Sequence, residues 1–356
     1  MTAPSVSPSR VSTLHVVQGQ REVAAIRVDA VAMGRAHGLD AATVDRLGIV
    51  VTEVAGNIAR HAGGGHIILR AVGEQGTGCI EILALDKGPG ISDMARVMRE
   101  DATPAGGVPR DGGLSAIRRL ADLFDIYSHP GRGTALVAHV GAPPGDDEKS
   151  RCVAETARHG CIGAVCVPLR GEDACGDDWV VDVVDGRTVI MLVDGLGHGP
   201  EAAIAARAAM TLFPGVTGKT PEIMLGELHA ALRHTRGAAL SVTVLDQVRH
   251  TARFCGVGNV DGRIATPDLN HHLVPQNGIV GHAMPRVHAD DVPWPTAGRL
   301  VMHSDGISSR WRAEAYPGLL ARHPALLAGV LFRDFARARD DATVLVVRDS
   351  IPPSPA

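Results

Sequence analysis

The segment from Val189 to Gly199, with the sequence VIMLVDGLGHG, restricts the possible folds of this chain more than any other segment. Five consecutive apolar residues predict a buried strand, and this strand ends abruptly at Asp194. The three glycines after Asp194 leave room for a ligand to approach the backbone closely. A carboxylate fixed at a strand end is a common ligand-facing group in layered sheet proteins. A plain turn that Asp194 merely favours fits the same pattern, so the role of this residue depends on the rest of the chain.

The composition favours a globular protein with about two domains. The chain has 356 residues, 45% of them hydrophobic, and domains of roughly 150 residues are common. The formal net charge is only −4 and no block of Lys or Arg is present, so nucleic acid is not an expected partner. The N-terminal residues lack the apolar core of a signal peptide, and no run reaches the roughly 18 to 20 apolar residues that cross a bilayer. We therefore expect a cytoplasmic protein without a membrane partner.

Turn-forming and charged residues mark the boundary between two α+β domains. The segment APPGDDEKS combines prolines, a glycine and charges, which is typical of an exposed linker. Helical and strand patterns are mixed before this linker. Short β-rich runs dominate after it, with helices predicted at Pro200 to Leu212 and at Pro221 to His234. The predicted parts are a disordered tail at 1–10, a first domain at 11–141, the linker at 142–150, a second domain at 151–349 and a tail at 350–356.

One predicted helix of the first domain carries a polar stripe. Helices are expected from Glu22 to His37 and from Ala41 to His61. In the second of them, apolar residues at helical spacing should face the core. Glu53, Asn57 and His61 lie on an adjoining stripe of the same helix.

A hairpin and several glycine-rich turns follow this helix. The runs HIILRAV and CIEILALD predict two paired strands, the second of which ends in an acid, Asp86. A short helix is expected at 92–100, a glycine-rich loop at 105–113 and a helix from Leu114 to Phe124. A second hairpin through HPGRGTALVAHV closes the domain.

The order and spacing of these fragments resemble those of the GHKL ATPase superfamily, and more closely those of the small serine kinases that regulate bacterial sigma factors. The matching pieces begin at Glu53 (EVAGN), Asp86 (DKGPG), Asp111 (DGGL) and Gly131 (GRGT). The resemblance implies an α/β sandwich that binds ATP with magnesium, in which Asn57 holds the metal ion and Asp86 recognises the adenine amino group. Glycines would let backbone amides approach the nucleotide. The expected binding residues are Asn57, Asp86, Gly88, Gly90, Gly112, Gly113, Gly133 and Thr134.

Glu53 is the candidate catalytic residue of this domain. It precedes Asn57 by one helical turn, so its carboxylate can accept the proton of a substrate hydroxyl while the γ-phosphoryl group is transferred. We therefore expect Glu53 to act as the general base of a serine kinase. A solvated helix residue without a catalytic role is the alternative.

Four acids recur at predicted strand ends in the second domain. They are Asp177, Asp194, Asp305 and Asp340. Carboxylates suit hard divalent cations, and acids that converge without a cation would repel one another. Asp177 and Asp340 are each followed directly by another aspartate, so the sequence leaves the register open by one residue at both places.

These acids, with the motif DGLGHG and the segment DDAT, resemble the PPM-type metal-dependent protein phosphatases, specifically the SpoIIE-like branch and its RsbX-like members. The resemblance implies a layered α-β-β-α sandwich. The segment from Gln276 to Val287 also resembles this branch, and we expect it to form a structured loop near the site. The implied ligands of two manganese or magnesium ions are Asp177, Asp194, Asp305, Asp340 and the carbonyl of Gly195.

The two resemblances together predict a bifunctional bacterial regulator. One domain would phosphorylate a STAS-type partner with ATP, and the other would remove phosphate from phosphoserine or phosphothreonine in a protein substrate of a stress or sigma-factor switch. The STAS partner comes from the family resemblance alone. Two alternatives stay open: a phosphatase whose ATP-binding domain is a sensor that transfers nothing, and a non-catalytic module that binds a sigma factor.

Overall fold

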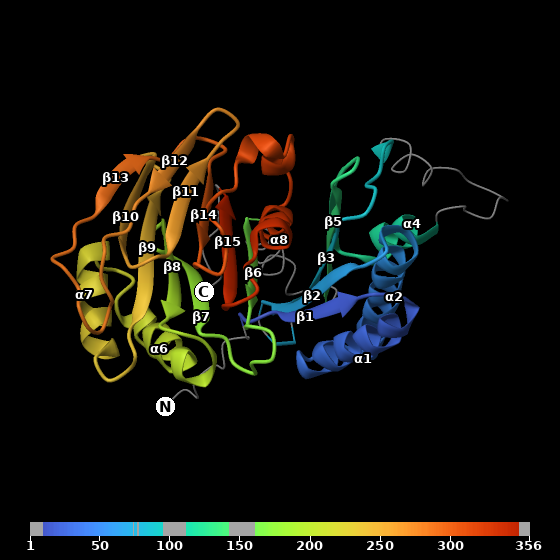
Figure 1. Cartoon of the computed structure of the whole chain (residues 1–356), viewed down its shortest axis with the longest axis horizontal. Coiled ribbons are helices and arrows are strands. Elements are labelled where there is room, and N and C mark those ends of the chain that lie inside the picture. The colour runs from blue at the N-terminus through green and yellow to red at the C-terminus, as the bar shows by residue number, and fades with distance from the viewer. Residues whose placement is uncertain (1–9, 74, 77, 95–111, 142–160, 349–356) are drawn as a thin grey trace. The chain divides into compact units, whose positions relative to one another are not determined.

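The computed structural model consists of two compact units, Met1–Cys152 and Val153–Ala356 (Figure 1). The predicted linker at 142–150, the tail at 350–356 and all but the last residue of the tail at 1–10 lie outside the described residues. The described residues are 10–73, 75–76, 78–94, 112–141 and 161–348.

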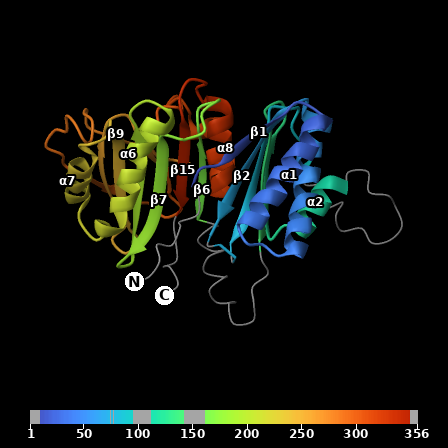
Figure 2. The same ribbon diagram turned by 90° about the horizontal axis from the view of Figure 1, so that it is seen from below.

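The first unit is a five-stranded antiparallel sheet with the strand order β1-β2-β3-β5-β4. Its helices pack on one face of the sheet, where their apolar side chains form the core (Figures 1 and 2). This arrangement confirms the predicted α/β sandwich. The elements are β1 (Thr13–Val17), α1 (Gln20–Ala36), α2 (Ala41–Asn57), β2 (Gly65–Val72), β3 (Cys79–Asp86), α4 (Gly112–Leu120), β4 (Leu123–His129) and β5 (Gly133–Gly141).

Helix α2 is fixed by its N-cap and by its apolar face. Asp40 caps it, because the Oδ1 atom of Asp40 accepts the backbone N–H of Thr43 at 2.9 Å. Leu47, Val50 and Val54 are buried in the core of the unit. This packing fixes the rotation of the helix about its axis. The polar stripe that begins at Glu53 therefore always faces the same side of the helix.

The last turn of this helix differs from the prediction. The α-helix ends at Asn57, and the chain continues in a π-helical turn, Ile58–Ala62, until Gly63 ends it with a φ of 70°. Single π turns inside or after α-helices occur frequently at functional sites, because they redirect side chains from the regular helical positions.

Helix α4 is shorter than predicted. It ends at Leu120 instead of Phe124, because the N–H of Asp122 donates to the carbonyl of His139 at 2.9 Å and strand β4 begins directly afterwards. Two predicted segments lie mostly outside the described residues: the short helix at 92–100 and the glycine-rich loop at 105–113.

The second unit consists of two five-stranded antiparallel sheets with helices on the outside. One sheet has the order β13-β10-β9-β8-β7 and carries α6 and α7, and the other has the order β12-β11-β14-β15-β6 and carries α8 (Figures 1 and 2). The predicted α-β-β-α sandwich is therefore confirmed. The strands are β6 (Ile162–Val167), β7 (Asp177–Val184), β8 (Arg187–Gly195), β9 (Ala238–Asp246), β10 (Thr251–Val257), β11 (Asp261–Ala265), β12 (Asn270–Leu273), β13 (Asp290–Pro293), β14 (Arg299–His303) and β15 (Ala342–Arg348). The α-helices are α6 (Gly199–Leu212), α7 (Pro221–Leu232) and α8 (Pro324–Phe335), and the short 3₁₀ turns are Phe213–Gly215, Ala313–Ala315 and Leu319–Ala321.

The inner faces of the two sheets contact each other through small polar and apolar side chains. The hydroxyl of Thr243 on β9 donates to the sulfur of Met302 on β14 at 3.7 Å, and the hydroxyl of Ser241 donates to the carbonyl of Val260 at 3.2 Å. All three side chains that take part are buried. Across the two sheets, β7 also contacts β15.

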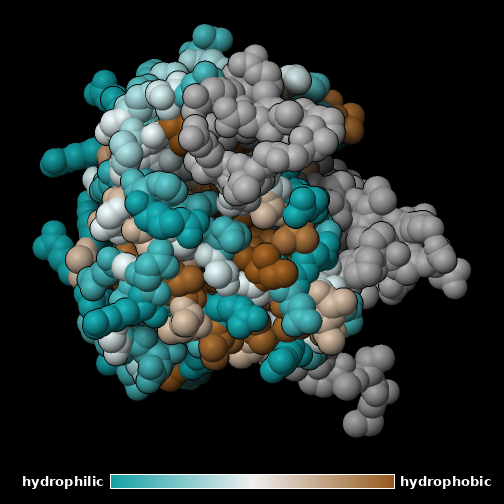
Figure 3. Space-filling model, turned by 90° about the vertical axis from the view of Figure 1, so that its right-hand side faces the viewer, coloured by the Kyte–Doolittle hydropathy of each residue, from teal (hydrophilic) through white to brown (hydrophobic). Residues whose placement is uncertain are grey.

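Hydrophilic side chains cover most of the face drawn in Figure 3, and the hydrophobic ones form patches between them. Among the described residues, no helix combines the length and the apolar character that a membrane span requires.

Candidate functional site

A cavity of about 1070 Å³ in the first unit brings together most of the residues predicted to bind nucleotide. It lies between the end of α2, the turn after β3 and the start of α4. Its volume is in the range of small-molecule and cofactor sites. The predicted residues that line it are Glu53, Asn57, Asp86, Gly90, Gly113 and Thr134.

Glu53 and Asn57 face the start of α4 from one side of α2. A Cβ atom added to Gly113 would lie 2.9 Å from the Oδ1 atom of Asn57 and 3.1 Å from the Oε2 atom of Glu53. A larger residue at this position would have to displace the ends of these two side chains. The predicted general base and the predicted magnesium ligand thus share one wall of the cavity.

Asp86 closes another side of the cavity. Its Oδ1 atom accepts the N–H of Gly88 at 2.8 Å and the N–H of Thr134 at 3.2 Å, which fixes the carboxylate at the end of β3. Gly133 packs directly against the carbonyl of Asp86, and a Cβ atom on Gly88 would lie 2.8 Å from Ala62. Gly88 and Gly133 thus shape the turn around Asp86 without lining the cavity themselves.

Gly112 is the first residue of α4. All eight predicted nucleotide-binding positions and Glu53 lie on the elements that surround the cavity, and their roles toward ATP stay predictions.

The four predicted metal ligands of the second unit lie at the ends of four strands. Asp177 begins β7 and is paired directly with Asp194 near the end of β8. Asp305 follows β14, and Asp340 precedes β15, its antiparallel neighbour in the other sheet. The backbone ties these last two segments together, because Ser304 N–H donates to the carbonyl of Thr343 at 3.1 Å.

The charges of these acids act on one another. Burial raises the pKa of Asp194 well above its usual value, and the charges of Asp177, Asp305 and Asp340 raise it further. Burial is also the largest cause that raises the pKa of Asp177 to about 7; the hydroxyls of Ser304 and Thr343 oppose this rise. For Asp305, burial and the charge of Asp340 raise the pKa.

The donor set fits a hydrated divalent cation. The Oδ2 atom of Asp177 is buried and has no hydrogen-bond partner, so a positive ligand would compensate it. Among the described residues, no three His, Cys, Asp or Glu side chains are close enough to enclose a metal ion by themselves. Mg²⁺ commonly keeps several waters and binds only one or two carboxylates directly, which agrees with this open arrangement.

Gly195 lies at the point where α6 crosses the end of β8. Its N–H donates to the carbonyl of Gly176 at 3.0 Å, and its Cα packs against the carbonyl of Ala202 so closely that no side chain fits. The role of the Gly195 carbonyl as a metal ligand stays a prediction.

The comparison with known proteins agrees with this geometry. Residues 184–349 match the family model described as stage II sporulation protein E (SpoIIE), and residues 18–139 match that of the histidine kinase-like ATPase domain. The serine/threonine-protein kinase RsbT of Bacillus subtilis (strain 168) is 38% identical over 98 residues, which are 27% of this chain and 72% of RsbT. The chain belongs to the RsbT family of GHKL ATPases, and its second unit carries a domain of the SpoIIE/PPM phosphatase type.

Two further relatives support this assignment. The phosphoserine phosphatase RsbX of Bacillus subtilis (strain 168) is 22% identical over 139 residues, which are 39% of this chain and 70% of RsbX. A solved structure described as "The bacterial stressosome: a modular system that has been adapted to control secondary messenger signaling" has a TM-score of 0.50 and 28% identity, and the match covers 53% of this chain and 98% of that chain.

In the RsbT-like unit, the structure adds Arg60 to the predicted residues. Its Nη2 atom donates to the Oδ1 atom of Asn57 at 2.9 Å and lies 3.6 Å from the Oε2 atom of Glu53. The side chain also lines the cavity. The spacing of Glu53, Asn57 and Arg60 by four and three residues places all three on one helical face, a signal that the sequence contains.

In the SpoIIE-like unit, side chains other than the predicted ligands hold Asp305 and the motif DGLGHG. Asn259 donates to the Oδ2 atom of Asp305 at 2.6 Å, and Arg337 donates to the carbonyl of Asp305 at 3.0 Å. His198, in the motif DGLGHG, contacts the Oε1 atom of Glu172 at 2.9 Å through its Nδ1 atom. These contacts fix the direction of Asp305 and connect the motif to the loop before β7.

The structure also separates the neighbouring aspartates. The carboxylate of Asp341 accepts the N–H groups of Leu169 and Gly176, both at 2.6 Å, and so anchors the loop before β7. The Oδ1 atom of Asp178 accepts the N–H of the next residue at 2.7 Å. Asp340 makes a local contact like that of Asp178, because its Oδ1 atom accepts the N–H of Asp341 at 2.9 Å. The choice of Asp177 and Asp340 as metal ligands stays a prediction.

The predicted loop from Gln276 to Val287 runs beside the start of β9. Ala238 and Val280 exchange both backbone hydrogen bonds, at 3.0 and 2.9 Å, and the N–H of Gln276 donates to the carbonyl of Gly256 at 2.8 Å. The loop therefore lies next to the strand that pairs with the end of β8.

Proposed function

We propose that this chain is a partner-switching regulator that removes phosphate from a phosphorylated protein with its SpoIIE-like unit and adds phosphate with its RsbT-like unit. The observation that carries the first half is the convergence of Asp177, Asp194, Asp305 and Asp340, with a buried carboxylate oxygen of Asp177 that lacks a partner. The names of the two relatives, a serine/threonine kinase and a phosphoserine phosphatase, support the pairing of opposite activities.

The hydrolytic step requires the acids to be held in fixed directions. Asp177 and Asp194 are fixed by their strand pairing, and Asp305 is fixed by Asn259 and Arg337. When bound, two manganese or magnesium ions would supply a nucleophile from water at neutral pH and neutralise charge on the phosphoryl group. Water attacks phosphorus directly, so the products are free phosphate and the serine or threonine hydroxyl of the substrate protein.

The phosphoryl transfer in the RsbT-like unit requires a base, a metal ligand and an adenine contact around one cavity. In this proposal, Glu53 takes the proton of the acceptor hydroxyl, Asn57 holds the magnesium of ATP, and Asp86 binds the adenine amino group; their common place in the cavity lining supports these roles. Arg60 contacts both Glu53 and Asn57 and lines the same cavity, so in this proposal its guanidinium binds a phosphate oxygen of ATP. A STAS-domain antagonist is the proposed acceptor and substrate.

The proposed function is tested by two assays on the purified full chain. With manganese and p-nitrophenyl phosphate or a phosphorylated STAS protein, the chain should release phosphate, and a metal chelator should abolish the release. With radiolabelled ATP and the unphosphorylated STAS protein, it should transfer the label to that protein. Failure of both assays, together with a melting temperature that manganese does not change, would favour the non-catalytic module that binds a sigma factor.

Asp86→Asn is expected to weaken ATP binding selectively at the base. An asparagine can retain its carbonyl oxygen toward Gly88 and Thr134, but it then presents an NH₂ group where the adenine amino group needs an acceptor. A lost hydrogen bond of this kind is worth about 1–3 kcal/mol, which is about 5- to 150-fold in Kd. Isothermal titration should show this loss for ATP with magnesium and no comparable loss for magnesium tripolyphosphate, which lacks the base. An equal loss for both ligands would contradict the adenine contact.

A further inference from the structure

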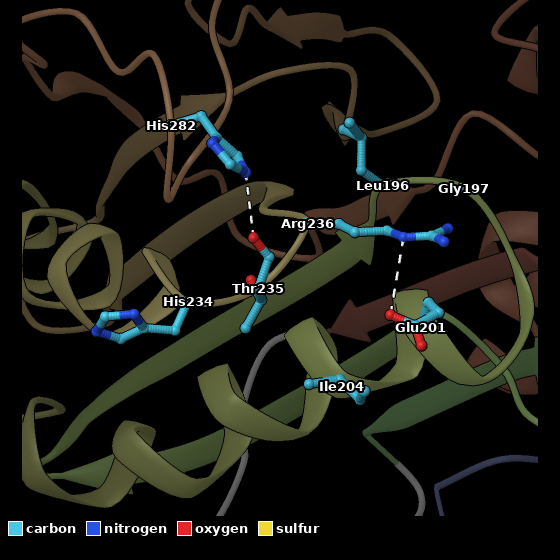
Figure 4. Close-up of a pocket in the computed structure, with 8 residues that line it drawn as sticks. All are labelled: Leu196, Gly197, Glu201, Ile204, His234, Thr235, Arg236 and His282. Atoms are coloured by element: carbon cyan, nitrogen blue, oxygen red, sulfur yellow. Dashed lines mark hydrogen bonds and ion pairs between the residues drawn. The ribbon is translucent and has the colours of Figure 1, made fainter.

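A second cavity of the SpoIIE-like unit, of about 730 Å³, adjoins the motif DGLGHG. Its walls come from the loop after β8, the first turns of α6, the segment that precedes β9 and the loop from Gln276 to Val287 (Figure 4). Leu196 and Gly197 in its wall follow Asp194 by two and three residues, a span of at most about 10 Å along the chain. The cavity therefore opens beside the candidate metal site.

The segment before β9 is attached firmly to this loop. Leu196 N–H donates to the carbonyl of Gly237 at 3.0 Å, and the Nε2 atom of His282 contacts the carbonyl of Thr235 at 3.1 Å. A Cβ atom added to Gly197 would lie 3.6 Å from a guanidinium nitrogen of Arg236. The cation of Arg236 is thus held over the loop that carries Asp194.

The side chains of this cavity combine positive charge with exposed aliphatic surface. Arg236 is 54% exposed, and its ion pair with Glu201, which is 62% exposed, is long at 3.9 Å (Figure 4). An exposed pair of this kind contributes about 0–1 kcal/mol to stability, so an incoming acid can replace it easily. Leu196 and Ile204 border the same cavity and leave 42% and 44% of their surface exposed.

We propose that this cavity binds the segment of the substrate protein that flanks the phosphorylated residue, and that it selects acidic and aliphatic side chains there. This inference rests on the proposed phosphatase activity and states which peptide sequences that activity prefers. Arg236 binds an acidic side chain of the flank, while Leu196 and Ile204 pack against an aliphatic one. A flank of about three extended residues spans the distance from the metal site to the cavity.

The charge preference is tested with two phosphoserine peptides. They are identical except that the three residues on each side of phosphoserine are glutamate in one and lysine in the other. We expect the wild-type chain with manganese to prefer the acidic peptide about tenfold in kcat/KM, and Arg236→Glu to reverse this preference, since one favourable charge contact of about 1.4 kcal/mol corresponds to tenfold. Arg249→Glu is the matched control, because Arg249 lies beyond the other end of β9 and has a similar long contact, 3.8 Å, with Asp246. This control should keep the wild-type preference.

The aliphatic preference is tested in the same way. We compare a peptide that has leucine in the flank with the same peptide that has serine there. Ile204→Ser should lower the ratio of their kcat/KM values by about fivefold, because it removes part of the apolar contact that buries the leucine side chain. Ile223→Ser removes an isoleucine of similar exposure, 51%, from α7 and should not change this ratio.

Hydrolysis of p-nitrophenyl phosphate distinguishes the proposed phosphatase activity from its proposed peptide specificity. If the wild-type chain hydrolyses this small substrate but acts equally on the acidic and the basic peptide, the specificity proposal is overturned and the phosphatase activity stands. If Arg236→Glu and Arg249→Glu change the peptide preference to the same extent, the effect is one of net charge and the proposal is also overturned. If the wild-type chain hydrolyses none of the substrates, both the proposed activity and its specificity are overturned.

Discussion

Asp194→Asn is expected to lower the manganese-dependent phosphatase kcat/KM by at least about 1000-fold, which corresponds to about 4 kcal/mol of transition-state stabilisation. The charges of Asp177, Asp305 and Asp340 all raise the pKa of Asp194, so we place Asp194 at the centre of the candidate metal site. An asparagine keeps the size of the side chain and removes its charge. Phosphate release from p-nitrophenyl phosphate and from a phosphoserine peptide should fall by the same factor, because the loss affects the reacting group.

Although Asp194→Asn should lower the activity, it should raise the stability of the metal-free protein. The pKa of Asp194 is raised in the folded chain, so between its unfolded value of about 3.9 and that raised value the folded state holds more protons than the unfolded state. The stability that this group contributes is therefore lost as the pH rises through this window. At pH 8 without metal, Asp194→Asn should raise the melting temperature by about 2–4 °C, while the stabilisation by manganese should disappear.

Asp178→Asn is the matched control for this prediction. Asp178 directly follows Asp177 on β7, but its carboxylate accepts a backbone N–H of its own strand. The variant should retain activity within about threefold, an effect of about 0.6 kcal/mol. Loss of activity in Asp178→Asn with retention in Asp177→Asn would shift the register of the proposed ligand set by one residue. Full activity of Asp194→Asn would exclude the proposed metal site.

Most of the fold could be predicted because its strands and helices have distinct periodicities. The paired strands β2 and β3, for example, are short β-rich runs on either side of a glycine-containing turn, and α2 combines a capping Asp40 with apolar residues at helical spacing. Helix α8 was missed, because nearly all of Pro324–Phe335 is apolar and buried. A helix without a polar face shows no periodicity, and a short apolar run of this kind fits a buried strand equally well.

Those residues of the candidate sites that belong to a local sequence motif could be predicted. Asp194 and Asp86 were recognisable because an acid ends an apolar run before a glycine turn in both cases. Asn259, by contrast, is 46 residues away from Asp305, which it contacts, and Glu172 is 26 residues away from its partner His198. Such contacts depend on how the strands assemble, so no local spacing indicates them. The Arg236 side chain was missed for the same reason.

Glu53→Gln is expected to reduce transfer of label from ATP to the STAS acceptor by about 10²- to 10⁴-fold, the usual contribution of a general base. A glutamine keeps the shape of Glu53 beside Arg60 and Asn57, but it cannot accept a proton. The Kd for ATP should change by less than about threefold, because this is an effect below roughly 1 kcal/mol. Asp45→Asn is the matched control, since Asp45 is exposed on the same helix, loses the same charge and does not line the cavity.

The transfer of label from ATP can be measured only when the phosphatase activity is removed from the chain. A wild-type chain that phosphorylates and dephosphorylates the same protein would show little label even if transfer were fast. Glu53→Gln and Asp45→Asn should therefore be compared in a chain that already carries Asp194→Asn. Strong labelling by Asp194→Asn and by the control, but not by the Glu53 variant, identifies Glu53 as the base. If Asp194→Asn binds ATP and labels no STAS protein, the RsbT-like unit is a nucleotide sensor, and the chain acts as a phosphatase under its control.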